Sequence, residues 1–488
     1  MSHTNYPEVF ILLIFKINRT FDFTTIMKRS LAIVFLCFFF SVAVRAQQGL
    51  PVQVAANRHY FQTADGKPFF WLGDTGWLLF VKCNRQEALH YLDIRKQQGF
   101  NVIQVMVLHT VTAKNVYSDF AVANGDVSKP VVTNGADFGD STQYDFWDHV
   151  EFIISEASKR GIYMALVPVW GSDVKGGKVS VEQAKAYARF LAGRFKKYTN
   201  IIWMNGGDIP GDEHMEVWNA IGTTLKKYDP AHLVTFHPRG RYTSSDWFQK
   251  QPWLDFNMAQ SGHRTYAQDT SLQEKHRFGE DNWRYIKLDW SLAPTKPVLD
   301  GEPSYEHIPY GLHDSLQPRW DAAAIRRYAY WSVFAGAAGF TYGDNAVMQF
   351  HTIKEGAGSF GVRENWQDEL TAAGATQMRF VKELLLSHDY FSRVPAQELI
   401  VNNNQTKYDY ILATKGKGYA MAYSYTGKPF RMDLAKLGFK PAKAKWYIPA
   451  SGKYIPAQLN RTKGVVQFDP PAAKENVDGT DRVLVLEK

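Results

Sequence analysis

Short apolar runs alternate with stretches of helical periodicity between Phe69 and about Tyr342. This alternation is typical of parallel strand and helix units. Eight runs are interpreted as buried strands, at residues 69–72, 101–107, 162–168, 201–205, 233–236, 256–260, 297–300 and 339–342. Eight such units over this length predict an α/β fold of the (β/α)8 TIM barrel type. An open doubly wound sheet is the alternative, but no glycine-rich phosphate loop follows the first run.

The pattern changes to a period of two after a helix predicted over residues 367–387. Six short runs, separated by Gly, Pro, Lys and Asn, predict antiparallel strands at residues 408–414, 418–425, 430–434, 443–448, 464–468 and 482–486. We therefore expect a small C-terminal antiparallel β-sandwich. The predicted domains are a catalytic barrel at residues 47–395 and the sandwich domain at residues 396–488.

The start of the chain has the pattern of a targeting segment. Lys28 and Arg29 precede an apolar run at residues 31–42, and a small residue, Ala46, follows. This pattern predicts a signal peptide within a leader of residues 1–46, with translation starting at Met27. We expect an exported protein in the periplasm, on the cell surface or secreted. The apolar run is short for a transmembrane helix, so we expect no stable membrane insertion of the mature chain.

Composition narrows the classes of partner. Aromatic residues make up 15% of the chain, with 14 tryptophans, which suits stacking on sugars, although packing in a large core is the alternative. The formal charge of +8 falls to +5 without the leader, and no clustered basic run supports binding of nucleic acid. An acidic polysaccharide stays compatible. Cys83 is the one cysteine after the leader, which permits no internal disulfide. The sequence does not indicate an oligomeric state.

Two acids follow strands on opposite sides of the predicted barrel mouth. Asp208 comes just after the fourth strand, behind Gly206 and Gly207, and Glu302 comes just after the seventh. Chemistry in such barrels lies at the C-terminal ends of strands. Hydrolysis of a glycosidic bond needs one carboxylic acid and one carboxylate. The two positions predict Asp208 and Glu302 as a catalytic pair. Capping of a helix or pairing with Arg is the structural alternative for each acid alone.

Other polar and aromatic residues at the predicted strand ends are candidates for binding substrate. They are Asp74, Trp77, Gln104, His109, Trp170, Asn205, His237, Gln260, His263 and Tyr342. Each can bind hydroxyls or stack on a sugar face, and each can instead satisfy nearby backbone groups. No set of His, Asp and Glu has the spacing of a metal site, so we expect no metal and no cofactor.

Three segments resemble a known family. Residues 69–77 (FFWLGDTGW), 203–208 (WMNGGD) and 299–303 (LDGEP) are similar to the apiosidase-like glycoside hydrolases, glycoside hydrolase family 140. The resemblance covers nearly the whole mature chain, because those proteins also carry a C-terminal collagen-binding-type β domain. It implies that Asp208 and Glu302 are the catalytic pair. It also implies a pectic substrate, rhamnogalacturonan II, cut at the linkage from apiose to galacturonic acid.

One departure from common barrel glycosidases concerns the fourth strand. The acid there usually follows an Asn directly, whereas Gly206 and Gly207 separate Asn205 from Asp208. The sequence therefore leaves the stereochemistry open, and we favour retention with Asp208 as acid/base and Glu302 as nucleophile. The alternatives are a barrel glycosidase with another substrate, such as an arabinofuranosidase or a β-glycanase, and a non-catalytic carbohydrate-binding protein.

Overall fold

The computed structural model describes residues 50–269, 277–401, 406–473 and 479–488. The leader predicted for residues 1–46, with its start at Met27, lies outside these residues. Among the helices in the described ranges, none has the length and hydropathy needed to cross a bilayer. The barrel and the C-terminal sheets belong to the same compact unit of the chain.

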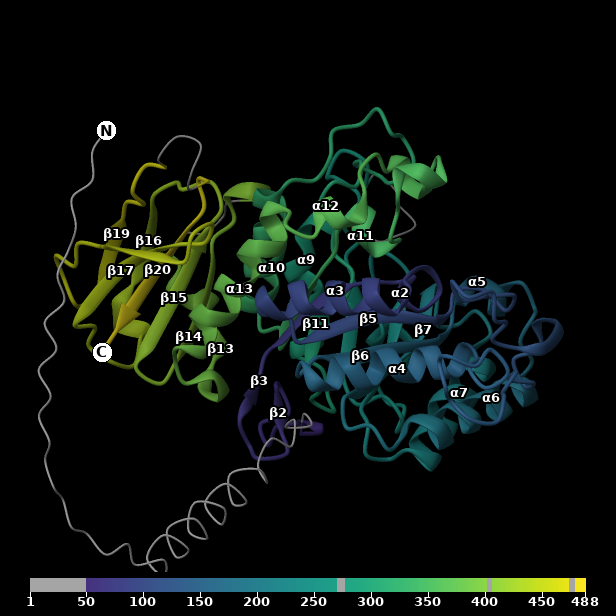
Figure 1. Ribbon diagram of the computed structural model, residues 1–488. Coiled ribbons are helices and arrows are strands. Elements are labelled where there is room, and N and C mark those ends of the chain that lie inside the picture. Colours follow the sequence, from purple (N-terminus) through teal and green to yellow (C-terminus); the bar gives the residue numbers. More distant parts are fainter. Residues whose placement is uncertain (1–49, 270–276, 402–405, 474–478) are drawn as a thin grey trace, which may run out of the picture. The chain divides into compact units, whose positions relative to one another are not determined.

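The predicted barrel is confirmed. A nine-stranded sheet has the order β8-β7-β6-β5-β4-β12-β11-β10-β9, and its helices lie around the strands (Figure 1). Its strands are β4 (Trp71–Thr75), β5 (Val102–Leu108), β6 (Tyr163–Val169), β7 (Ile201–Ile209), β8 (Val234–Pro238), β9 (Tyr242–Thr243), β10 (Asn257–Gln260), β11 (Val298–Asp300) and β12 (Gly339–Tyr342). All neighbours pair in parallel except β9, which is antiparallel to β10.

The barrel closes between β8 and β10 through individual hydrogen bonds rather than a regular ladder. Asp255 N donates to Val234 O at 2.8 Å, and Thr235 Oγ1 donates to Phe256 O at 2.7 Å. The two ends of the sheet therefore meet. The doubly wound sheet that the sequence left as an alternative is wrong, because such a sheet stays open.

Long helices connect the strands and pack outside the barrel. They are α3 (Arg85–Gln97), α4 (Phe146–Lys159), α6 (Val181–Phe195), α7 (Met215–Tyr228), α9 (Asn282–Trp290), α10 (Ala322–Phe334) and α13 (Ala373–Leu386). Shorter helices are α2 (Leu79–Lys82), α5 (Gly171–Lys175), α8 (Ser245–Phe248), α11 (Asn345–Met348) and α12 (Trp366–Glu369). Capping boxes begin α3, α4 and α6, so side chains satisfy N–H groups that the first helical turn leaves unpaired.

The structure corrects two predicted boundaries in the barrel. The first barrel strand begins at Trp71, because Phe69 belongs to β3 (Pro68–Phe69) and pairs with Phe61 of β2 (Phe61–Thr63) in a small sheet with β1 (Val52–Val54). The fourth strand continues through Asp208 to Ile209 instead of ending at residue 205.

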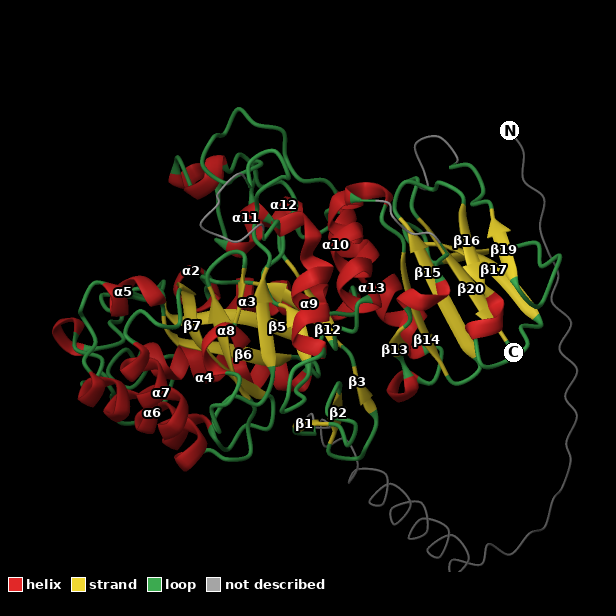
Figure 2. Cartoon of the chain, turned by 180° about the vertical axis from the view of Figure 1, so that it is seen from behind, coloured by secondary structure: helices red, strands yellow, loops and turns green. Residues whose placement is uncertain are grey.

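The C-terminal region is antiparallel, as predicted. One sheet has the order β13-β14-β15-β20-β17-β18, and β16 pairs with β19 in a second (Figure 2). The strands are β13 (Val394–Pro395), β14 (Leu412–Gly416), β15 (Tyr419–Ser424), β16 (Phe430–Asp433), β17 (Lys443–Ile448), β18 (Lys453–Pro456), β19 (Val465–Phe468) and β20 (Arg482–Glu487). Met432 and Val466 of the small sheet share an apolar core with Trp446 and Leu484 of the large one. The sequence missed β18, an edge strand whose mostly exposed side chains give no apolar alternation.

Helix α10 contacts both the barrel and the C-terminal sheets, and both views place it beside β14 and β15. The ring of Tyr330 stacks on Tyr423 at 4.9 Å. A buried ion pair links Arg326 Nη2 to Asp481 Oδ1 at 2.8 Å. An aromatic contact and an ion pair therefore hold the C-terminal sheets against the barrel.

Candidate active site

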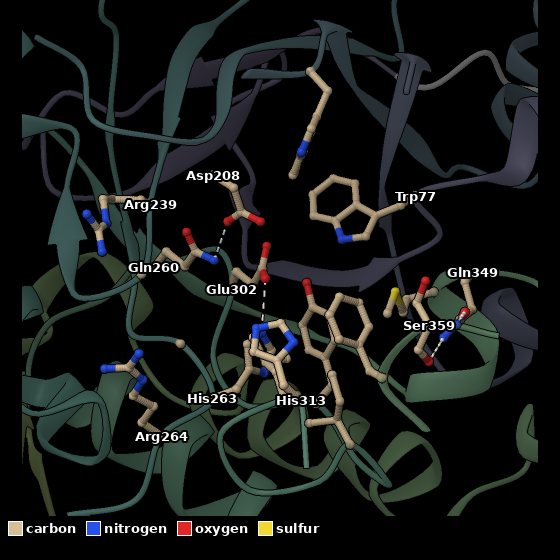
Figure 3. Close-up of a pocket in the computed structure, with 18 of the residues that line it drawn as sticks. Trp77, Asp208, Arg239, Gln260, His263, Arg264, Glu302, His313, Gln349 and Ser359 are labelled. Atoms are coloured by element: carbon tan, nitrogen blue, oxygen red, sulfur yellow. Dashed lines mark hydrogen bonds and ion pairs between the residues drawn. The ribbon is translucent and has the colours of Figure 1, made fainter. Parts of the chain in front are cut away.

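A cavity of about 610 Å³ opens at the C-terminal ends of the barrel strands. Each of the eight parallel strands, or the loop that follows it, contributes to the wall. In strand order along the chain, these residues are Trp77, Met106, Trp170, Asp208, Arg239, Gln260, Glu302 and Met348. Figure 3 shows Asp208 and Glu302 facing the same space, with Arg239 and Arg264 to one side and Trp77 to the other.

A bulge in β7 places Asp208 at this cavity. The register with β8 shifts between Gly206 and Ile209. Gly206 and Gly207 have φ of 90° and 115°, which favour glycine, and Asp208 itself is left-handed with φ of 49°. A Cβ on Gly207 would lie 2.5 Å from the Trp170 ring. The glycines therefore let the strand turn against Trp170.

Glu302 lies in the loop after β11, where two histidines hold it. Its residue is 5% exposed. His263 Nε2 lies 3.0 Å from one carboxylate oxygen, and His237 Nε2 lies 3.0 Å from the other. Asp300, at the end of β11, accepts a hydrogen bond from Ser261 Oγ at 2.7 Å and so fixes the loop that carries His263.

The two acids are close to each other but have different surroundings. Ligand atoms of Asp208, His237 and Glu302 all lie within 4.8 Å of one another. Asp208 accepts one side-chain hydrogen bond, from Gln260 Nε2 at 2.7 Å. Asp208 is exposed and lines the open cavity.

These surroundings separate the pKa values of the two acids. Desolvation, followed by the negative charge of Glu302, raises the pKa of Asp208 to about 6. Burial also acts to raise the pKa of Glu302, but the interactions with His237 and His263 outweigh it and lower the pKa to about 2. Burial lowers the pKa of His237, but the carboxylates of Glu302 and Asp208 raise it overall. At neutral pH this arrangement favours a charged Glu302 beside an Asp208 that holds a proton more readily than usual.

Five of the predicted binding residues lie at this centre. Trp77, Trp170, Gln260 and His263 line the cavity. His237 contacts Glu302 instead, and its ring packs against Trp77 at 5.5 Å and Trp170 at 5.7 Å. The two indoles thus shield the Glu302–His237 contact.

The other five do not line the cavity. His109 is partly buried outside it, and Asp74, Gln104, Asn205 and Tyr342 are buried in the barrel. The side chains of the four buried residues have protein partners: Arg95 Nε for Asp74 at 2.6 Å, Gly301 O for Gln104 at 2.9 Å, Trp218 O for Asn205 at 2.8 Å and Glu306 Oε2 for Tyr342 at 2.6 Å. Gln104 and Asn205 lie inside β5 and β7 and not at their ends, and the side chains of the four buried residues satisfy polar groups within the protein.

The sequence interpretation missed several wall residues. Arg239 and Arg264 each follow a predicted site residue by one or two positions, so the same strand-end rule extended by two residues would have found them. Tyr305 follows Glu302 by three, and its buried hydroxyl has no hydrogen-bond partner. Phe360 comes from the long loop after β12, and no local pattern in the sequence brings it to the cavity.

Two groups of side chains within the described ranges are candidates to hold a metal ion. The first group is Asp208, His237 and Glu302 at the cavity. The second is His307 from the loop after β11, Asp344 from just after β12 and Glu369 from α12. In each group a histidine nitrogen lies 2.8 to 3.0 Å from carboxylate oxygens. These are also the distances of hydrogen-bonded ion pairs.

The chain matches two family models. Residues 55–392 match "Apiosidase-like, catalytic domain", and residues 394–487 match "Putative collagen-binding domain of a collagenase". No curated protein matches the chain.

Two solved structures are similar over most of their length. One, named "Glycoside hydrolase", is 43% identical, with a TM-score of 0.82, and covers 90% of this chain and 97% of its own. The other, a glycoside hydrolase family 5 protein from Bacteroides vulgatus, is 41% identical, with a TM-score of 0.82, and covers 90% of this chain and 93% of its own. The catalytic-domain model spans more than half of the chain, so this protein belongs to the apiosidase-like family and is a glycoside hydrolase.

Proposed function

We propose that Asp208 and Glu302 hydrolyse a glycosidic bond with retention of configuration. The observation that carries the proposal is the separation of their pKa values, to about 6 and about 2, in carboxyls whose atoms approach within 4.8 Å. Two titratable groups whose pKa values are separated by their surroundings are suited to the roles of acid and nucleophile. The spacing agrees better with the ~5–5.5 Å of retaining enzymes than with the ~6.5–9.5 Å of inverting ones.

The reaction follows in two steps. Asp208 donates its proton to the leaving oxygen while a Glu302 oxygen attacks the anomeric carbon and the glycosidic bond breaks. Asp208, now ionised, takes a proton from water, whose oxygen displaces Glu302 and releases the sugar. The histidines at 3.0 Å keep Glu302 ionised before attack, and Gln260 orients Asp208.

For the substrate, we propose the linkage from apiose to galacturonic acid in rhamnogalacturonan II. Membership of the apiosidase-like family supports the apiose. Arg239, Arg264 and Lys175 line the cavity together with Trp77 and Trp170, which suits an anionic sugar chain. We also propose that the protein acts after export, in the periplasm or at the cell surface, where such polysaccharide fragments are encountered.

Purified protein tests both parts. We expect release of apiose-bearing side chains from rhamnogalacturonan II, and NMR during early hydrolysis should show the product anomer of the same configuration as the substrate. Sugar release only from xylan, glucan or arabinan would overturn the substrate. Initial formation of the opposite anomer would overturn retention.

A further inference from the structure

The carboxylate of Glu280 joins three parts of the protein. This residue, in the turn Gly279–Asp281 before α9, is completely buried. Its Oε1 accepts hydrogen bonds from Arg327 Nη2 of α10 and from Tyr408 Oη, each at 2.8 Å. Its Oε2 accepts one from the backbone N of Tyr266 at 2.6 Å. Tyr408 belongs to the C-terminal domain, so one carboxylate ties that domain to the barrel.

Tyr266 lies in the loop that supplies one wall of the active site. The loop leaves β10 and passes through His263 and Arg264, which line the cavity. Further bonds tie it to the next loop: Gly311 N donates to His263 O at 2.8 Å, and Gln268 Nε2 donates to Tyr310 O at 3.1 Å. The position of the His263 ring therefore depends on the anchors of this loop, and Glu280 is one of them.

The C-terminal domain also shields the cation that holds Glu280. Arg327 is 1% exposed, and its Nε and Nη1 find no hydrogen-bond acceptor. Its guanidinium lies 4.7 Å from the ring of Tyr408 and 5.3 Å from that of Tyr425, both from the C-terminal domain. The ring of Tyr408 also meets Tyr266 edge to face at 5.5 Å. Aromatic faces of this kind stabilise a buried cation.

We propose that the C-terminal domain supports the active site, with Tyr408 as a positioning residue for His263 through Glu280 and the Tyr266 loop. This inference rests on the proposed role of Glu302. The Tyr408 hydroxyl fixes one oxygen of Glu280, Glu280 fixes the backbone at Tyr266, and the loop holds His263 against Glu302 at 3.0 Å. Loss of the hydroxyl loosens this chain of contacts at its outer end.

The test compares two single-atom deletions at the same domain boundary. Tyr408→Phe removes the hydroxyl bonded to Glu280 and keeps the ring that contacts Arg327 and Tyr266. Tyr447→Phe is the matched control, because its hydroxyl donates across the boundary to Phe380 O of α13 at 2.8 Å and touches no part of the cavity. Both variants lose one hydrogen bond between domain and barrel.

The readouts are hydrogen exchange and the pH dependence of kcat/KM. In Tyr408→Phe we expect faster amide exchange in residues 261–269, and kcat lowered about three- to tenfold by misplacement of the site. The acid-side limb of kcat/KM should move up by about half a pH unit, because a looser His263 stabilises ionised Glu302 less. Tyr447→Phe should keep wild-type exchange in that loop and the wild-type pH profile.

Equal exchange and equal pH profiles in the two variants would overturn the proposal. An equal shift in both would also overturn it, since the effect would then be general destabilisation. Hydrogen exchange separates this outcome from failure of the proposed function: faster exchange in Tyr408→Phe, together with a Glu302→Gln variant that keeps more than a tenth of wild-type activity, would reject the role of Glu302 and leave the positioning of the loop by Tyr408 intact.

Discussion

The ends of β7 and β11 carry the same functional group in opposite environments. At β7, a bulge exposes the Asp208 carboxyl to the cavity with one amide donor from Gln260. At β11, Glu302 is buried between two histidines. The pKa of the first rises to about 6, whereas that of the second falls to about 2.

This difference shows what burial alone cannot decide. Desolvation acts on both acids to raise the pKa. It dominates at Asp208, on which His237 and His263 act only through their charge, but not at Glu302, with which both histidines also form hydrogen bonds. The partners therefore assign the roles: the acid bonded to a neutral amide holds its proton to a higher pH, and the acid between histidines stays charged. Because Glu302 is itself the charge that raises the pKa of Asp208, the two roles depend on each other.

Removing the charge at β11 should have the largest effect. Glu302→Gln keeps the shape of the side chain but removes the nucleophile, so we expect kcat to fall by about 10⁴- to 10⁶-fold. Initial rates on an aryl glycoside measure this. Retention of more than a tenth of wild-type activity would contradict a covalent role for Glu302.

Removing the acid at β7 should lower kcat less, and the size of the loss should depend on the leaving group. Asp208→Asn is expected to lower kcat by about 10²- to 10⁴-fold on a polysaccharide. With a dinitrophenyl leaving group, which needs no protonation, the first step should be nearly restored and a glycosyl-enzyme intermediate should accumulate. Equal losses on both kinds of substrate would argue against Asp208 as the acid.

Displacing Asp208 without changing its chemistry should have an intermediate effect. Gly207→Ala puts a Cβ 2.5 Å from the Trp170 ring at a φ of 115°, so we expect about a 10- to 100-fold loss of kcat/KM. Gly177→Ala is the control, because that glycine is also left-handed, with φ of 69°, and a Cβ there meets nothing within 4 Å. Similar losses in both variants would show that backbone strain, rather than the position of Asp208, limits the activity.

Weakening the support of Glu302 should have the smallest effect on the rate at neutral pH. His263→Ala removes one of two histidine contacts and leaves His237 in place, so we expect about a tenfold loss of kcat/KM. The pKa of Glu302 should rise, so activity should be lost at a higher pH on the acid side. A pH series on this variant would contradict the account if the acid limb stayed at its wild-type position.

Much of the fold was predictable because hydrophobic periodicity is local. Eight apolar runs marked the barrel strands, and the structure confirms them. The bulge at Asp208 was not predictable in geometry, although its glycines were visible. It depends on packing against Trp170, which is distant in the sequence.

The site was predictable to the level of strand ends and no further. The rule selected Gln260 and His263, which line the cavity, but equally Asp74 and Tyr342, which point into the barrel wall. The direction in which a side chain at a strand end points depends on the register of the strands in the closed barrel. The contact of His237 with Glu302 joins β8 to the loop after β11, and no spacing along the chain encodes it.

The pH dependence of kcat/KM in wild type and Asp208→Asn tests the central claim most directly. Glu302 must be ionised and Asp208 protonated, so wild-type activity should fall above a pKa of about 6 and, on the acid side, only toward a pKa of about 2. On a substrate with an activated leaving group, Asp208→Asn should lose the alkaline limb and keep the acid one. An alkaline limb that persists unchanged in Asp208→Asn would contradict the assignment of the two acids.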